Sequence, residues 1–86
     1  MYFIRSTEEI FIKKDGTKHF NRMINLSNVI TIQKKMEASS NPGFYIIQFS
    51  CNDGTNREWL YSTRHDMMKT YEKIYDYIKT VQNTKL

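Results

Sequence analysis

The sequence has few of the residues that carry chemistry. Its 86 residues include one cysteine, two histidines, one proline and three glycines. A single cysteine cannot form an internal disulfide, and one cysteine with two distant histidines lacks the spacing of a zinc site. No histidine is placed by spacing to activate Cys51 as a nucleophile, so we expect Cys51 to be a buried structural residue. These absences predict no metal, no cofactor, no enzymatic activity and a reducing, cytoplasmic setting.

Long hydrophobic runs are also missing. No apolar stretch approaches the ~20 residues that span a bilayer, and the start, MYFIRSTEE, lacks the features of a signal peptide. We therefore expect no membrane partner. The 40% hydrophobic content still exceeds what a disordered chain contains, so we expect one folded domain over residues 1–86.

The net charge of +4 is concentrated in the N-terminal part. Residues 1–36 hold seven basic and three acidic side chains, whereas residues 37–86 hold six of each. Such asymmetry is typical of contact with an anionic partner, although lysines also protect solvated edge strands. The candidate residues for an anionic partner are Lys13, Lys14, Lys18, Arg22, Lys34 and Lys35. Between them, Phe11, His19 and Phe20 are suited to stacking on nucleic-acid bases.

Turn residues divide the first two thirds of the chain into strands. Asp15–Gly16 predicts a two-residue hairpin turn between EIFIKK and TKHFNRM, and the NDG at residues 52–54 predicts a second turn. These turns fully explain Asp15 and Asp53 without a catalytic role. In the alternating stretch VITIQKKM, Ile30 and Ile32 are predicted to share the face under the helix.

The C-terminal part predicts one amphipathic helix over about residues 64–82. Thr63 is suited to the N-cap position, and Asp66 lies three residues later, as in a capping box. A stripe with helical spacing follows: Met67, Tyr71, Ile74, Ile78 and Val81, widened by Met68 and Tyr75. The order of elements predicts an α+β fold, with a curved antiparallel sheet of five or six strands and this C-terminal helix.

The stretch GFYIIQFSC, residues 43–51, is apolar on both faces. Phe44 and Ile46 point one way, and the opposite row is Tyr45, Ile47, Phe49 and Cys51. One helix covers only one face, so the other needs either barrel curvature or a second copy of the chain. The candidate interface residues are Phe44, Ile46, Trp59, Tyr61 and Tyr77. Tyr77 lies off the apolar stripe of the helix, and aromatic residues are enriched at interfaces.

The segments FIRS, INLSNVITI, NDG and EWLYST occur in an order that resembles a group of small uncharacterised bacterial and phage proteins with an INLxNV turn-strand pattern. The arrangement also resembles, more loosely, a shortened pleckstrin-homology fold, in which a C-terminal helix closes a bent antiparallel sheet. This chain departs from the simpler pattern by inserting TEEIFIKKDGTKHF, which carries most of the basic excess. Folds of this kind host unrelated functions, so the resemblance implies little about activity; by analogy alone, such proteins act as inhibitors or adaptors of other proteins.

Together these observations predict a non-enzymatic binding module that acts through protein–protein contacts. Self-association into a homo-oligomer is the first expectation, with inhibition or adaptation of another protein beside it. The alternative is nucleic-acid or nucleotide binding through the basic N-terminal segment.

Overall fold

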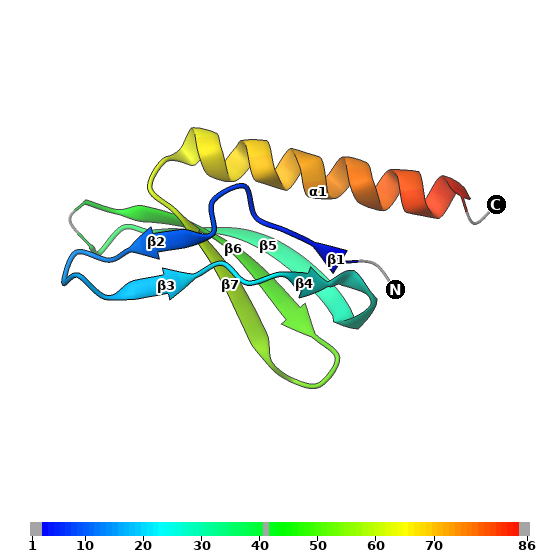
Figure 1. The fold of residues 1–86 in the computed structure, drawn as a ribbon, viewed down its shortest axis with the longest axis horizontal. Helices are drawn as coiled ribbons and strands as arrows, with labels where there is room; N and C mark the ends of the chain where they lie inside the picture. Colours follow the sequence, from blue (N-terminus) through cyan, green and yellow to red (C-terminus); the bar gives the residue numbers. More distant parts are fainter. Residues whose placement is uncertain (1–2, 41, 85–86) are drawn as a thin grey trace.

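The computed structural model describes residues 3–40 and 42–84, the last four of these as backbone only. Its fold is α+β, with antiparallel strands followed by one C-terminal helix, as predicted (Figure 1). The elements are β1 (Phe3–Ile4), β2 (Ile10–Ile12), β3 (Lys18–Phe20), β4 (Ile24–Asn25), a 3-10 turn η1 (Leu26–Asn28), β5 (Val29–Glu37), β6 (Phe44–Cys51), β7 (Asn56–Tyr61) and α1 (Arg64–Thr84).

The strands form three small sheets, so the prediction of one curved sheet of five or six strands is wrong. The pairings are β1–β4, β2–β3 and β5–β6–β7, all antiparallel. The segment after β3 runs beside β7 but contacts it through side chains. Asn21 accepts a hydrogen bond from the Leu60 N–H (2.8 Å) and donates one to the Leu60 carbonyl (3.0 Å). Because side chains replace a backbone ladder there, the sheet ends at β7.

Both predicted turns are present, but each is a three-residue loop and not the two-residue hairpin expected at Asp15–Gly16. The Lys13 N–H donates to the Thr17 carbonyl (2.8 Å), and the Gly16 N–H donates to the Lys13 carbonyl (2.9 Å). Gly16 has a φ of 89°, whereas every described non-glycine residue has a negative φ. A two-residue type I′ turn needs positive φ at both central residues, which Asp15 does not adopt.

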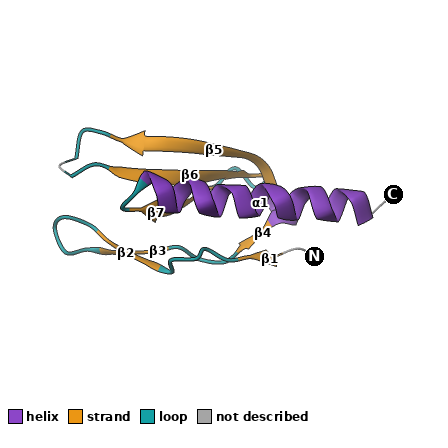
Figure 2. Cartoon of the chain, turned by 90° about the horizontal axis from the view of Figure 1, so that it is seen from above, coloured by secondary structure: helices purple, strands orange, loops and turns teal. Residues whose placement is uncertain are grey.

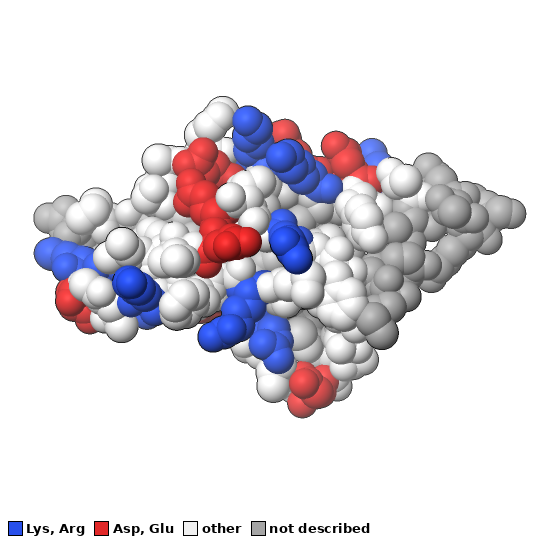
Figure 3. All heavy atoms as spheres, viewed as in Figure 1, with Lys and Arg blue, Asp and Glu red and all other residues white. Residues whose placement is uncertain are grey.

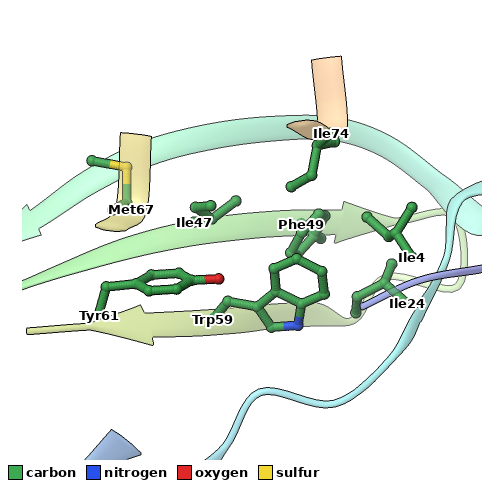
Figure 4. Close-up of a cluster of buried hydrophobic side chains, with 8 residues drawn as sticks. All are labelled: Ile4, Ile24, Ile47, Phe49, Trp59, Tyr61, Met67 and Ile74. Atoms are coloured by element: carbon green, nitrogen blue, oxygen red, sulfur yellow. The ribbon is translucent and has the colours of Figure 1, made fainter. Parts of the chain in front are cut away.

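The core lies between α1 and the face of β6 and β7 beneath it. Figure 4 shows Ile47, Phe49, Trp59 and Tyr61 side by side; all four are fully buried. The rings of Phe49 and Trp59 pack edge to face, with centroids 4.8 Å apart. Met67 and Ile74 cover this layer from the helix, while Ile4 and Ile24 close one end of it. Ile47 and Phe49 of β6 therefore face the helix, and so do Trp59 and Tyr61 of β7, which were predicted as interface residues.

Ile30 does not join this core, which corrects the prediction for β5. The register shifts between Val29, opposite Cys51, and Thr31, opposite Ser50. Ile30 is thus the extra residue of a bulge and is 68% exposed. Ile32 packs against the core as predicted, and Val29 packs there in place of Ile30, because the bulge changes the alternation of the strand.

The second apolar row is partly covered by the chain's own N-terminal hairpin, a cover that the sequence did not predict. The Phe11 ring of β2 lies 5.3 Å from the Phe44 ring. Leu60 is buried, and Phe44 and Ile46 are partly buried. The inserted segment of the sequence therefore supplies part of the missing cover.

The helix begins as predicted and ends two residues later than expected. The Asp66 N–H donates to Thr63 Oγ1 (3.1 Å), so Thr63 caps the first turn. Met67 and Ile74 are buried, whereas Tyr75, which was expected to widen the apolar stripe, is 54% exposed. The predicted role of Val81 lies outside the described side chains. Over the described part of the chain, no helix has the length and apolar character needed to cross a membrane.

Candidate functional site

The two edges of the three-stranded sheet differ. At the β7 edge, side chains satisfy the backbone: Asn21 bonds both groups of Leu60, and His19 Nε2 donates to the Glu58 carbonyl (2.8 Å). At the β5 edge, no strand among residues 3–40 and 42–84 pairs with the outer side. In Figure 2, β5 lies at the margin of the molecule, and the helix lies over β6 and β7. The open edge of the sheet is therefore β5.

The register shows which backbone groups of β5 point outward. On β7, Glu58 and Leu60 face away from β6, so Trp59 forms its backbone bonds with Ile47. Direction alternates along a strand, so Gln48 and Ile46 bond to their β5 partners Gln33 and Lys35. The N–H and C=O groups of the alternate residues, Ile32, Lys34 and Met36, consequently point outward from the sheet.

This edge also carries uncovered apolar side chains. Ile30 is 68% exposed and Met36 is 59% exposed. A hollow of about 370 Å³ lies between β5 and α1, lined by Lys34, Met68, Tyr71, Glu72, Tyr75 and Asp76. The Lys34 ammonium lies 4.6 Å from the centroid of the Tyr71 ring. We call this surface, made of the β5 edge and the hollow beside it, the β5 edge surface.

The structure does not gather the six basic candidates into one patch. Lys13 flanks the hairpin turn and Lys14 lies in it, Lys18 is on β3, and Lys34 and Lys35 point to opposite faces of β5. The remaining candidate, Arg22, lies with its guanidinium 5.4 Å from the Phe20 ring centroid. Figure 3 shows basic side chains spread over one face of the molecule with acidic ones between them.

Of the three side chains suited to base stacking, one is available. Phe11 packs on Phe44, and His19 bonds to the Glu58 carbonyl, so both turn inward. Phe20 stays 48% exposed. It shares the outer face of the hairpin with its cross-strand partner Ile10 and with Ile12, which are 49% and 63% exposed. That face is more aliphatic than a base-stacking platform.

The five interface candidates fall into three environments. Trp59 and Tyr61 are fully buried, so their side chains belong to the core and not to the surface. Phe44 and Ile46 are partly buried on the face away from the helix. Tyr77 is exposed and lines a hollow of about 240 Å³ with Phe3, Thr7 and Lys73 among others.

A polar cluster joins the segment after β1 to the core. The hydroxyls of Ser6 and Tyr61 share a hydrogen bond, as do those of Thr7 and Thr70 (2.9 Å). Burial raises the pKa of Tyr61, which stays neutral. Burial, followed by the nearby Asp66 carboxylate, raises the pKa of Glu8. Because each of the four hydroxyls has a hydrogen-bond partner, the cluster fixes the segment after β1 against β7 and α1.

Asp15 and Asp53 act locally, in their turns. Asp15 and Asp53 each accept a hydrogen bond from the N–H of the threonine two residues later, Thr17 and Thr55, both at 2.9 Å. Bonds to these threonines lower the pKa of both carboxyls. Among the described residues, no group of three or more histidine, cysteine or acidic side chains is placed to hold a metal ion. Cys51 is buried, as expected.

Sequence reasoning missed Asn21, which decides where the sheet ends. It is 4% exposed and also donates to the Glu8 carbonyl (2.7 Å). An asparagine after a short strand usually indicates a turn, so no local signal distinguishes this role.

No protein-family model, curated protein or solved structure matches the chain.

Proposed function

We propose that the protein is a non-enzymatic binding module that acts through protein–protein contacts, and that its first contact is with a second copy of itself. The observation that carries this proposal is the β5 edge surface. An unpaired strand edge is a template for another strand, and uncovered apolar side chains beside it add contact area. Capture of a strand from a different protein at this surface would use the same groups.

The length and contents of β5 support the proposal. The strand has nine residues, whereas strands are commonly about 5–6 residues long. Natural edges are often protected by lysines, and β5 carries Lys34 and Lys35. Here the Lys34 ammonium is drawn over the Tyr71 ring, and Lys35 lies on the opposite face. Each face of the β5 edge therefore carries only one lysine charge to protect it.

Size-exclusion chromatography with light scattering over a range of concentrations tests self-association. We expect more than one chain per particle at high micromolar concentration and dissociation on dilution. A monomer at every concentration would contradict the self-association proposal. Pull-down with the immobilised chain then examines whether a different protein occupies the same edge.

Binding of nucleic acid or a nucleotide is a second candidate function. The observation that favours it is the hairpin, where Lys18 lies on the same face as the exposed Phe20, Arg22 lies beside the Phe20 ring, and Lys13 and Lys14 lie at the turn. Replacing the three lysines by glutamate is expected to abolish a gel shift with single-stranded nucleic acid. Affinity should fall with salt, with a log–log slope of about −0.7 per neutralised phosphate.

The matched control places the same charge change on the helix. Lys69, Lys73 and Lys79 are exposed, so their replacement by glutamate alters the net charge equally without touching the hairpin. If both triple variants lose the shift equally, the binding is unspecific attraction to a basic protein. If the parent gives no shift at low salt, this second function is wrong.

A further inference from the structure

We propose that two copies of the chain join through antiparallel pairing of β5 with β5 of the second copy, about a twofold axis at Gln33. This inference rests on the proposed self-association and specifies its geometry. The two three-stranded sheets would become one continuous sheet with both helices on the same face. The occupant of the β5 edge surface is therefore a second copy of this chain.

The direction of the backbone groups restricts the possible registers. Outward-pointing residues must stand opposite outward-pointing residues to exchange hydrogen bonds. A pairing centred on Gln33 meets this condition, because Ile32 stands opposite Lys34 of the second copy and the reverse pair is identical by symmetry. The same centre overlaps all nine residues of both strands, from Val29 to Glu37.

The side chains favour this centre over its neighbours. A pairing centred on Lys34 or on Lys35 sets two lysines directly opposite each other, which is destabilising. Centring on Ile32 moves Met36 beyond the end of the opposite strand. With Gln33 on the axis, the closest like charges are the two Lys34 side chains in diagonal positions, and each ammonium lies over its own Tyr71 ring.

The same register brings together the exposed apolar residues of the edge. Ile30 of one copy stands next to Met36 of the other, and these side chains are 68% and 59% exposed in the single chain. This complementarity of a strand with its own reverse is the observation that identifies a second copy as the occupant. It also gives the bulged Ile30 a contact that the core does not provide.

A cysteine on the axis tests the register directly. In a non-hydrogen-bonded antiparallel pair the Cα atoms lie about 4.5 Å apart, within the range that a disulfide bridges. We expect Gln33→Cys to form a covalent dimer under mild oxidation. The matched control is Lys35→Cys, which lies on the same face but stands opposite Thr31 of the second copy. The parent gives the background, because its Cys51 is buried.

A proline tests the pairing without a new bond. Lys34→Pro removes an outward N–H and leaves the ladder to β6 intact, and edge strands tolerate such a proline. We expect the dissociation constant of the dimer to rise more than about tenfold, because backbone hydrogen bonds between the copies are lost. Lys34→Ala, which keeps the N–H, should stay within a few-fold of the parent. Circular dichroism checks that each variant is folded.

The outcomes separate this inference from the proposed function. A monomeric parent overturns both self-association and the twofold pairing. A dimeric parent in which Gln33→Cys gives no cross-link above background overturns the pairing alone. Cross-linking by Lys35→Cys in place of Gln33→Cys overturns the register and therefore the inference. If Lys34→Pro fails to fold, the two cysteine variants still decide.

Discussion

The side chain of Asn21 makes the hydrogen bonds to the β7 backbone that the main chain of a further strand would otherwise make. Its amide bonds both the N–H and the C=O of Leu60, and its nitrogen also reaches the Glu8 carbonyl. All of this happens at a site that is 4% exposed. Asn21 therefore closes the β7 edge together with His19, which explains why the sheet remains open only at β5 within the described chain.

Removing this amide should destabilise the fold. Asn21→Ala leaves the backbone groups of Leu60 without partners in a buried place, which costs about 2 kcal/mol in the free energy of unfolding. Urea denaturation measures the change. Asn56→Ala is the control, because Asn56 is exposed and lies on the same strand as Leu60. Equal stability of the parent and Asn21→Ala would mean that water replaces the amide at no cost.

The pKa of Glu8 is shifted in the opposite direction to those of the other shifted carboxyls. A change of pH therefore affects the stability of the fold through Glu8 in the opposite sense. Burial and Asp66 raise its pKa, so the folded protein binds this proton more tightly than the unfolded chain does. The ionised form therefore lowers stability above the raised pKa, and the penalty is relieved as pH falls through it. For Asp15, Glu37 and Asp53, whose pKa values are lowered, stability is instead lost as pH falls.

Neutralising Glu8 isolates its contribution. We expect Glu8→Gln to be more stable than the parent at neutral pH by less than about 1 kcal/mol, because solvent screens the pair. The gain should shrink to zero at acidic pH, where Glu8 is already protonated. Thermal unfolding across pH measures this, with Glu9→Gln as the exposed neighbour for control. A gain that persists unchanged in acid would refute the electrostatic cause.

At the scale of elements, the two DG turns are built alike. Gly16 and Gly54 have φ values of 89° and 86°, and an added Cβ would meet nothing within 4 Å at either position. The glycines are therefore needed for backbone conformation alone. Gly43 is different, because its Cβ would lie 2.8 Å from the Glu37 carbonyl oxygen.

Substitution separates these two reasons. Gly54→Ala should cost about 1 kcal/mol through the left-handed backbone, and Gly54→Asn should cost less, because asparagine tolerates that region. For Gly43, alanine and asparagine should be similarly harmful, since any Cβ meets the same backbone oxygen. Chemical denaturation of the four variants gives the comparison. Equal costs of alanine and asparagine at position 54 would argue against the backbone explanation.

The elements show what periodicity predicts. Alternation placed Ile47 and Phe49 under the helix, and the capping residue Thr63 placed the start of α1. Periodicity did not predict the bulge at Ile30, because one extra residue changes the face of a side chain without changing composition. It also could not distinguish a three-residue loop from a two-residue turn, since both use the same Asp-Gly pair.

At the scale of the whole molecule, the fold class was predictable and the division into three sheets was not. Whether neighbouring segments join through backbone or side-chain bonds depends on Asn21 and His19, which carry no periodic signal. For the same reason, the sequence did not indicate that Trp59 and Tyr61 would be core residues while β5 stayed open. The proposed interface is therefore the edge of β5, and not the aromatic rows that the sequence indicated.

Amide hydrogen exchange followed by NMR as a function of protein concentration tests the central claim most directly. The amides of Gln33 and Lys35 bond to β6, so they should be protected at every concentration, as should that of Leu60 through Asn21. The outward amides of Ile32 and Lys34 should exchange rapidly in dilute solution and become protected as the protein associates. Association that leaves these two amides equally unprotected would contradict pairing at the β5 edge.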